Sequence, residues 1–254
     1  MSASTIVGLV TSALSTVEWT QTARHGDGSL VLLKDMPPLH MKASASPPNR
    51  ASLVLDRTKR FQQYVGFGGA FTEAAAINWR KLSAERQQEV IDRYFGPPEK
   101  GGLGYTLGRV PINSCDFSPA SYTFDDVEGD VKLEHFDTEV KHDVEAGMIP
   151  MIRAAQAAAK ARGQSLRLVA SPWSPPAWMK RPVYDWRVGR EVQSMLASAK
   201  PSGLLPSMER PWAEYFAKWI TAYAGHGIDV WAVTVQNEPE ATAGWEAMLW
   251  TPER

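Results

Sequence analysis

Four short apolar runs alternate along most of the chain with segments whose apolar residues recur at helical spacing. The runs end in glycine, proline or polar residues, which predicts buried β-strands. They lie near residues 65–71, 104–111, 166–171 and 230–235. The segments between them predict helices over residues 83–94, 150–162 and 211–225. Strands that alternate with helices predict an α/β fold with a parallel sheet covered by helices.

The helix predicted over residues 211–225 has the clearest pattern. Its large apolar residues fall three or four positions apart and form one stripe that can face a sheet. They are Trp212, Tyr215, Phe216, Trp219, Ile220 and Tyr223. The helix over 83–94 has matching end signals, since Ser83 suits an N-cap and Gly96 precedes two prolines. By contrast, residues 180–210 carry scattered Pro and Gly and predict an irregular connection.

The first 62 residues have a different pattern. Residues 29–33 and 51–56 predict strands, and two Pro-Pro pairs between them, at 37–38 and 47–48, break any long element. Two or three strands cannot form a stable sandwich alone, so this small β unit needs strands from elsewhere. The sequence therefore predicts one domain over residues 1–62 and a second over 63–254.

Composition narrows the class of protein. The chain has 254 residues, 44% of them hydrophobic, and a formal net charge of −1. These values are typical of a globular protein and give no indication of a nucleic-acid partner. No apolar run approaches the roughly 18 residues of a membrane span. Residues 6–14 are apolar but follow no Lys or Arg, so we expect a soluble protein without a cleaved signal, and the compartment stays open.

The sequence contains no clear motif for a metal site, a dinucleotide site or a thiol nucleophile. The histidines at positions 25, 40, 135, 142 and 226 lack metal-ligand spacing, and the glycines near residue 66 do not complete a dinucleotide fingerprint. Cys115 is the only cysteine, which excludes an internal disulfide, and no histidine near it in sequence suggests a thiol nucleophile. We expect neither a metal nor a cofactor.

Residues with chemical potential follow three of the four predicted strands. Arg109 lies in the second strand and Asp116 follows it, Trp173 follows the third, and Asn237 and Glu238 follow the fourth. Each has an ordinary alternative: a structural Arg, a turn-capping Asp, a Trp that anchors a loop, or a solvated Glu. Parallel strand ends meet at one edge, so together they predict one pocket. A carboxylic acid beside an amide suits glycoside hydrolysis, in which the acid protonates the leaving oxygen.

Four motifs carry a resemblance to a known family. They are Gly66-Phe-Gly-Gly-Ala-Phe-Thr-Glu73, Arg109-Val-Pro-Ile-Asn-Ser-Cys-Asp-Phe-Ser118, Ala170-Ser-Pro-Trp-Ser-Pro-Pro-Ala-Trp178 and Trp231-Ala-Val-Thr-Val-Gln-Asn-Glu-Pro239. In this order and spacing they resemble the glucosylceramidase group of glycoside hydrolase family 30. The resemblance runs from about residue 63 to the last residues. The first 60 residues match more loosely and are similar to the strands that enter the family's side β domain.

The resemblance implies a retaining β-glycosidase with a (β/α)8 barrel, of which about the first four βα units are present. Residues 1–62 would be strands of an incomplete side β domain, and 63–254 the N-terminal half of the barrel. By the same resemblance, Glu238 is the general acid/base and Asn237 contacts the sugar near its 2-hydroxyl. Asp116 and Trp173 would line the glucose subsite, and Arg109 would order the carboxylates from beneath.

The resemblance also implies a second carboxylate. The family's nucleophile follows the seventh barrel strand, roughly a hundred residues beyond the acid/base, and a retaining mechanism needs the two carboxyl groups about 5 Å apart. Glu73, Asp116, Glu240 and Glu246 offer no convincing replacement, so we expect the chain alone to be inactive. A missing C-terminal half or self-association would then complete the fold.

The resemblance leaves the substrate partly open. It implies a β-glucoside or glucosphingolipid substrate, and peripheral contact with lipid stays open. The alternatives are activity on β-1,6-glucan or xylan within the same family, a non-catalytic carbohydrate-binding fragment, and an unrelated α/β domain.

Overall fold

The chain divides into two units, residues 1–62 and 63–254, in a computed structural model that describes residues 16–40, 56 and 58–253. Within its described residues, the first unit contains two antiparallel strand pairs. They are β1 (Thr16–Val17) with β4 (Leu39–His40), and β2 (Thr20–Arg24) with β3 (Leu30–Asp35). The strand predicted over 29–33 is present as β3. The predicted strand over 51–56 and the apolar segment 6–14 lie outside the described residues, apart from Asp56.

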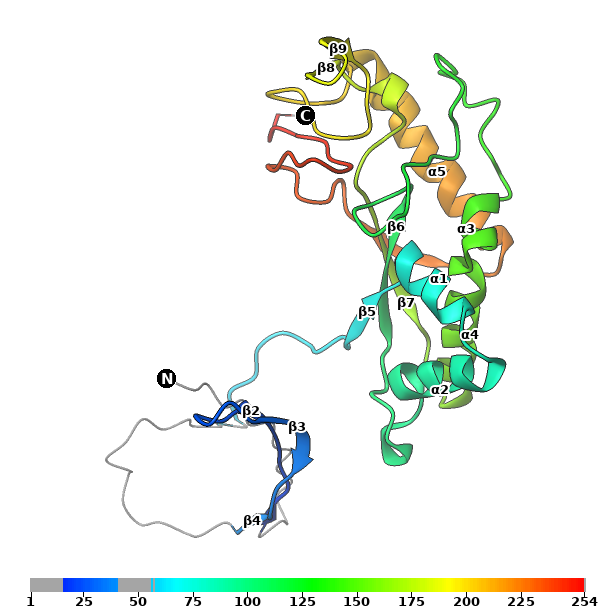
Figure 1. Cartoon of the computed structure of the whole chain (residues 1–254). Coiled ribbons are helices and arrows are strands. Elements are labelled where there is room, and N and C mark those ends of the chain that lie inside the picture. Colours follow the sequence, from blue (N-terminus) through cyan, green and yellow to red (C-terminus); the bar gives the residue numbers. More distant parts are fainter. Residues whose placement is uncertain (1–15, 41–55, 57, 254) are drawn as a thin grey trace. The chain divides into compact units, whose positions relative to one another are not determined.

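The second unit is built on a four-stranded parallel sheet with the order β10-β7-β6-β5 (Figure 1). Its strands are β5 (Gly68–Ala70), β6 (Leu107–Ile112), β7 (Arg167–Pro172) and β10 (Val230–Val233). All four predicted strands are therefore present; β5, β6 and β10 are shorter than the apolar runs that predicted them, and β7 is shifted by one residue. The α/β class and the parallel sheet expected from the sequence are confirmed.

Helices cover the sheet in the second unit. They are α1 (Glu73–Arg80), α2 (Ala84–Phe95), α3 (Lys141–Ala146), α4 (Met148–Ala161) and α5 (Glu209–Gly225), with short 3-10 helices η1 (Pro98–Lys100), η2 (Ala177–Met179) and η3 (Pro206–Met208). Helices α1 to α4 lie together on one side of the sheet (Figure 1). No helix in the described part of the chain is long and apolar enough to cross a membrane.

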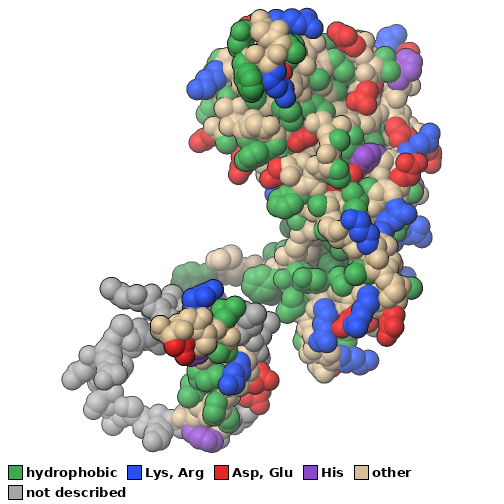
Figure 2. Space-filling model, viewed as in Figure 1, with side chains coloured by type: hydrophobic (Ala, Val, Ile, Leu, Met, Phe, Trp, Pro, Cys, Tyr) green, Lys and Arg blue, Asp and Glu red, His purple; other side chains and the backbone are tan. Residues whose placement is uncertain are grey.

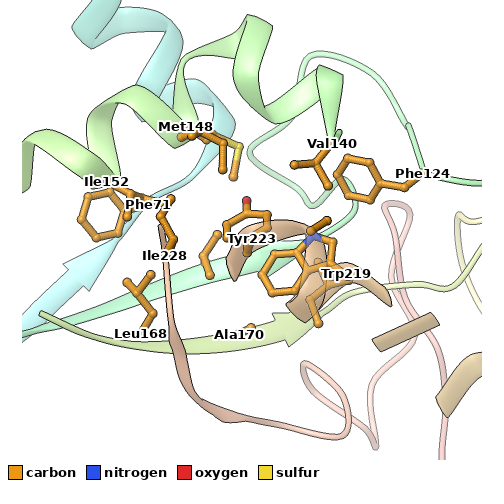
Figure 3. Packing of buried hydrophobic residues seen from close by; sticks show 14 of the residues in the cluster. Phe71, Phe124, Val140, Met148, Ile152, Leu168, Ala170, Trp219, Tyr223 and Ile228 are labelled. Atoms are coloured by element: carbon orange, nitrogen blue, oxygen red, sulfur yellow. The ribbon is translucent and has the colours of Figure 1, made fainter. Parts of the chain in front are cut away.

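The core lies between the helices and this face of the sheet. Ile152 of α4 and Leu168 of β7 are both 0% exposed and belong to the buried cluster drawn in Figure 3. Four residues of the stripe predicted on α5 are buried, with Trp219 and Tyr223 fully enclosed, while Phe216 and Ile220 are partly buried. Burying such large side chains removes much apolar surface from water, which is the main stabilising contribution.

One glycine is required by this packing. An added Cβ at Gly108 of β6 would lie 2.5 Å from the Phe71 ring and 2.8 Å from Leu168. Both distances are shorter than real Cβ contacts, so the absence of a side chain lets Phe71 pack directly on the strand.

The sequence missed several short elements. Helix α1 begins at the Thr72 N-cap, whose side chain accepts a hydrogen bond from the amide of Ala75. The sequence predicted only the glycine-rich strand before it and not this helix. Helix α3 has six residues, too few to show a helical period. Residues 180–210 are not wholly irregular, because β8 (Val183–Asp185) and β9 (Arg190–Val192) form an antiparallel hairpin there.

Both edge strands of the sheet carry exposed apolar side chains. Near β5 these include Tyr64 and Phe67, and hydrophobic side chains gather around this edge in Figure 2. On and after β10 they include Trp231, Val233 and Val235, all about half exposed or more. Apolar surface gathered at two open sheet edges is typical of a sheet that pairs with further chain.

Candidate active site at the carboxyl ends of the parallel strands

Arg109 connects the ends of three neighbouring strands. It lies on β6, where its neighbours Val110 and Ile112 point into the core, and its side chain lies away from that cluster. Its Nε donates to Ser171 Oγ at 3.1 Å, and its Nη2 donates to Asn237 Oδ1 at 2.8 Å. Arg109 and Asn237 are 128 residues apart in sequence, so the parallel sheet alone brings them together.

Trp173 is the third member of this cluster. The Arg109 guanidinium carbon lies 4.6 Å from the centre of the indole, a cation–π contact. Trp173 is only 7% exposed, so little of its ring surface is open to solvent.

Asn237 is held at both its side chain and its backbone. Its N–H donates to the carbonyl of Pro172 at 2.8 Å, which continues the pairing of β10 with β7. Because the Arg109 guanidinium can only donate, the side-chain oxygen of Asn237 faces it. The amide NH2 of Asn237 is therefore directed away from Arg109 and is left to donate elsewhere.

Glu238 follows Asn237 directly and is exposed. Its φ is +47°, a left-handed conformation that is unfavourable for a residue with a long side chain. Non-glycine residues in this region cost about 1–3 kcal/mol and persist only where the surrounding structure holds them. The contacts of the loop after β10 must therefore hold the backbone of Glu238 in this conformation.

Asp116 makes no hydrogen bond to the residues of this cluster. It is exposed in a turn after β6, closed by the bond from Ser118 N to the carbonyl of Cys115 at 2.9 Å. No hydrogen bond joins its side chain to Arg109, Trp173 or Asn237 among the described residues. Its neighbour Cys115 is buried, and burial raises the pKa of that thiol to about 11, which keeps it protonated and unreactive.

Two other acids weighed from the sequence have structural partners. Glu73 is 4% exposed and contacts the Nε2 atom of His142 at 2.8 Å. Glu246 is 5% exposed and accepts hydrogen bonds from Ser114 Oγ at 2.8 Å and Ser121 Oγ at 2.7 Å. Neither carboxylate is directed into the Arg109 cluster by these contacts.

The sequence also missed residues that support the cluster. Gln236 is buried and donates to the carbonyl of Trp173 at 2.7 Å, joining the loop after β10 to the one after β7. Ser171 Oγ accepts from Thr234 Oγ1 at 2.8 Å as well as from Arg109. One feature of the sequence could have indicated Gln236, Ser171 and Thr234: each is a polar residue at or just after the end of an apolar strand.

A parallel α/β sheet that gathers Arg, Asn and Trp beside an exposed Glu at its carboxyl edge is the arrangement expected of barrel-type glycoside hydrolases. Residues 64–253 match the model of the glycosyl hydrolase family 30 TIM-barrel domain. The chain belongs to glycosyl hydrolase family 30.

Individual relatives agree with this family. The chain is 38% identical over 212 residues to putative glucosylceramidase 3 of Caenorhabditis elegans, covering 80% of the chain and 36% of that protein. It is 36% identical over 212 residues to the lysosomal acid glucosylceramidase of Mus musculus, with 79% and 36% covered. It is 31% identical over 193 residues to endo-1,6-beta-D-glucanase neg1 of Aspergillus fumigatus, with 74% and 37% covered.

A solved structure gives the same picture. The crystal structure of SrfJ from Salmonella typhimurium superimposes with a TM-score of 0.64 at 34% identity, covering 76% of this chain and 38% of that one. The chain therefore spans less than half the length of each of these relatives.

Proposed function

We propose that this chain is the N-terminal part of a retaining β-glycosidase that hydrolyses glucosylceramide or a related β-glucoside. The observation that carries the proposal is the Arg109 cluster, which links Trp173 and Asn237 directly before Glu238. Glucosylceramidases among the relatives support the substrate class.

In this proposal Glu238 is the general acid/base. It donates a proton to the glycosidic oxygen as the bond to the sugar breaks, and then takes a proton from the attacking water. Its exposed position at the carboxyl end of a parallel strand is the position that barrel enzymes use for catalysis. Its positive φ differs from the extended backbone of the strand that precedes it.

The neighbouring residues bind the sugar in this proposal. The NH2 group of Asn237, directed away from Arg109, donates to an oxygen near the sugar 2-position. Trp173 and Asp116 line the glucose subsite. Arg109 has no direct role on the sugar and fixes the orientation of Trp173 and Asn237.

We further propose that the four strands are half of an eight-stranded (β/α) barrel and that residues 1–62 belong to a side β domain. The exposed apolar side chains at both sheet edges support this, because strand pairing would cover them. The nucleophilic carboxylate would come from the other half of the barrel. The 254-residue chain by itself is then expected to hydrolyse almost nothing.

Two alternatives to glucosylceramide hydrolysis remain: another substrate within the family, and a function without catalysis. The endo-1,6-β-glucanase relative supports activity on β-1,6-glucan, and xylan is a further candidate in the same family. Comparing cleavage of glucosylceramide, β-1,6-glucan and xylan separates these substrates. The other alternative is a non-catalytic carbohydrate-binding fragment, which would bind these sugars without cleaving them.

A hybrid enzyme tests the acid/base role. Residues 64–253 would replace the matching segment of the mouse glucosylceramidase, and hydrolysis of alkyl and dinitrophenyl β-glucosides would be measured. Glu238→Gln should lower the rate on the alkyl glucoside by roughly 10²–10⁴-fold, because that poor leaving group needs a proton. The dinitrophenyl substrate should lose less at the glycosylation step.

The exposed neighbour Glu240 provides the matched control. Glu240→Gln should leave both rates close to those of the parent hybrid. Equal loss on both substrates in Glu238→Gln would contradict the acid role. Turnover of an aryl β-glucoside by the 254-residue chain alone, abolished by Glu238→Gln, would contradict the proposed inactivity of the chain.

A further inference from the structure

A buried lysine connects two loops at the carboxyl end of the sheet. Lys180 follows η2 directly and is 0% exposed. Its Nζ donates to the carbonyls of Met195 at 2.8 Å, Ala197 at 2.7 Å and Ala247 at 2.8 Å. Three carbonyls match the three N–H donors of an ammonium group. The first two acceptors follow β7 and the third follows β10, so the side chain joins the two connections.

Glu246 extends this connection to a third loop. Its carboxylate accepts from Ser114 and Ser121, which follow β6. The backbone beside it pairs with the Lys180 acceptors, since Ala197 N donates to the carbonyl of Trp245 at 3.0 Å and Ala247 N donates to that of Met195 at 3.2 Å. Segments from the loops after three strands therefore meet at one buried charged cluster.

The charge at this position is costly to bury. Burial lowers the pKa of Lys180 to about 7, and the negative charge of Glu246 acts in the opposite direction. An apolar side chain could fill the same space without this cost. What an apolar side chain cannot do is satisfy three carbonyls and so fix the register of one loop against the other.

The loop fixed in this way is the one that carries Glu238. Its two ends are joined by the bond from Trp250 N to the carbonyl of Pro239 at 2.9 Å. Its middle is held by the bond from Ser198 N to Thr242 Oγ1 at 3.0 Å. The left-handed backbone of Glu238 at the start of this loop requires such support, because it is unfavourable by itself.

We propose that Lys180 is a positioning residue for Glu238, acting through the Ala247 carbonyl, with Glu246 as its counter-charge. This inference rests on the proposed function, in which Glu238 is the proton donor. It predicts that removing the ammonium loosens residues 238–250 and weakens binding of a ligand that pairs with the Glu238 carboxylate.

The test uses the 254-residue chain with Lys180→Met, which keeps much of the volume and removes all three donors. Amide hydrogen exchange of residues 238–250 should become roughly 10-fold faster. Binding of a glucose-configured iminosugar, a cation that mimics the transition state, should weaken by roughly 10-fold under conditions where the protein stays folded. Because the protein is fully folded under those conditions, a lower global stability does not by itself weaken iminosugar affinity. A loss of affinity therefore indicates that Lys180 positions Glu238, and does not merely contribute to packing.

Met179→Ala is the matched control, since Met179 is the adjacent residue, is 0% exposed and lies outside the candidate site. It should lower the free energy of unfolding without changing exchange in 238–250 or iminosugar affinity. The proposal is overturned if exchange in Lys180→Met is unchanged, if Met179→Ala accelerates it equally, or if exchange rises while affinity stays the same.

Two further outcomes are decisive as well. If neither the unmodified chain nor the hybrid enzyme described above binds the iminosugar, the proposed function loses its support, and the exchange measurement still decides the role of Lys180. If Lys180→Met does not fold, Glu246→Gln takes its place, because it keeps the acceptor for both serines and removes the counter-charge. Faster exchange in 238–250 then supports the proposal, and unchanged exchange overturns it.

Discussion

Asp143 should make the stability of this protein depend on pH in a direction that is unusual for a carboxylate. The side chain is 0% exposed, in α3. It accepts hydrogen bonds from the hydroxyl of Tyr122 at 2.8 Å and from that of Tyr223. Figure 3 shows the Tyr223 ring within the apolar core. Burial raises the pKa of Asp143 to about 6, although both tyrosines and His142 favour the charged form.

The sign and magnitude follow from this pKa. The folded protein holds the Asp143 proton more tightly than the unfolded chain does, where the pKa is near 3.8. The stabilisation is therefore complete below about pH 4 and is lost as pH rises through about 6. At about 1.4 kcal/mol per pH unit, the difference amounts to about 3 kcal/mol.

Replacing Asp143 with Asn removes the titration and keeps the shape. Urea unfolding of both proteins would be followed by tryptophan fluorescence at about pH 4, 5, 6 and 7.5, since linkage predicts where the curves diverge. Relative to Asp143→Asn, the parent should lose about 3 kcal/mol of unfolding free energy between the lowest and highest pH. Groups that titrate in both proteins cancel in this difference.

The exposed residue Asp229 offers a control for the loss of one negative charge. Asp229→Asn should follow the pH dependence of the parent within about 0.5 kcal/mol. If the curves of the parent and Asp143→Asn stay parallel across the whole range, the reasoning from burial is wrong. The same conclusion would follow if Asp229→Asn showed the change expected of Asp143→Asn.

Two further predictions concern the buried thiol and the glycine under the core. Because the pKa of Cys115 is raised to about 11, a disulfide reagent at neutral pH should label the native protein roughly 100-fold more slowly than the urea-unfolded chain; equal rates would contradict its burial. Gly108→Ala should cost about 1–3 kcal/mol in urea unfolding, because its Cβ would overlap Phe71 and Leu168. Gly225→Ala, whose Cβ would meet open space, should stay within about 0.5 kcal/mol, and a similar loss in both would contradict the packing argument.

Much of the second unit could be predicted from periodicity alone. The stripe on α5 and the end signals of α2 are local, so they are visible in sequence, and Ser83 indeed caps α2 through the amide of Arg86. Short elements such as α3 and the β8–β9 hairpin could not be predicted, because they are too short to show a period. Their conformation depends on contacts with distant residues.

The candidate site was predictable only in part. The ends of parallel strands share an edge, so Arg109, Trp173 and Asn237 could be expected near one another. The contacts among these residues could not be predicted. The sequence does not say that Arg109 lies over the Trp173 ring or that the side-chain oxygen of Asn237 faces Arg109. It also did not indicate that the other three residues contact one another while Asp116 makes no hydrogen bond to them.

The sequence by itself determined the family, the alternation of strands and helices, and the types of residue at the strand ends. These depend on local patterns that survive without knowledge of the partners. Only the tertiary structure decided which charges are buried. Lys180, Glu246 and Asp143 look like ordinary surface residues in sequence, and each is enclosed by groups from distant segments. Desolvation and hydrogen bonding by those groups give them their properties, and no local pattern encodes that environment.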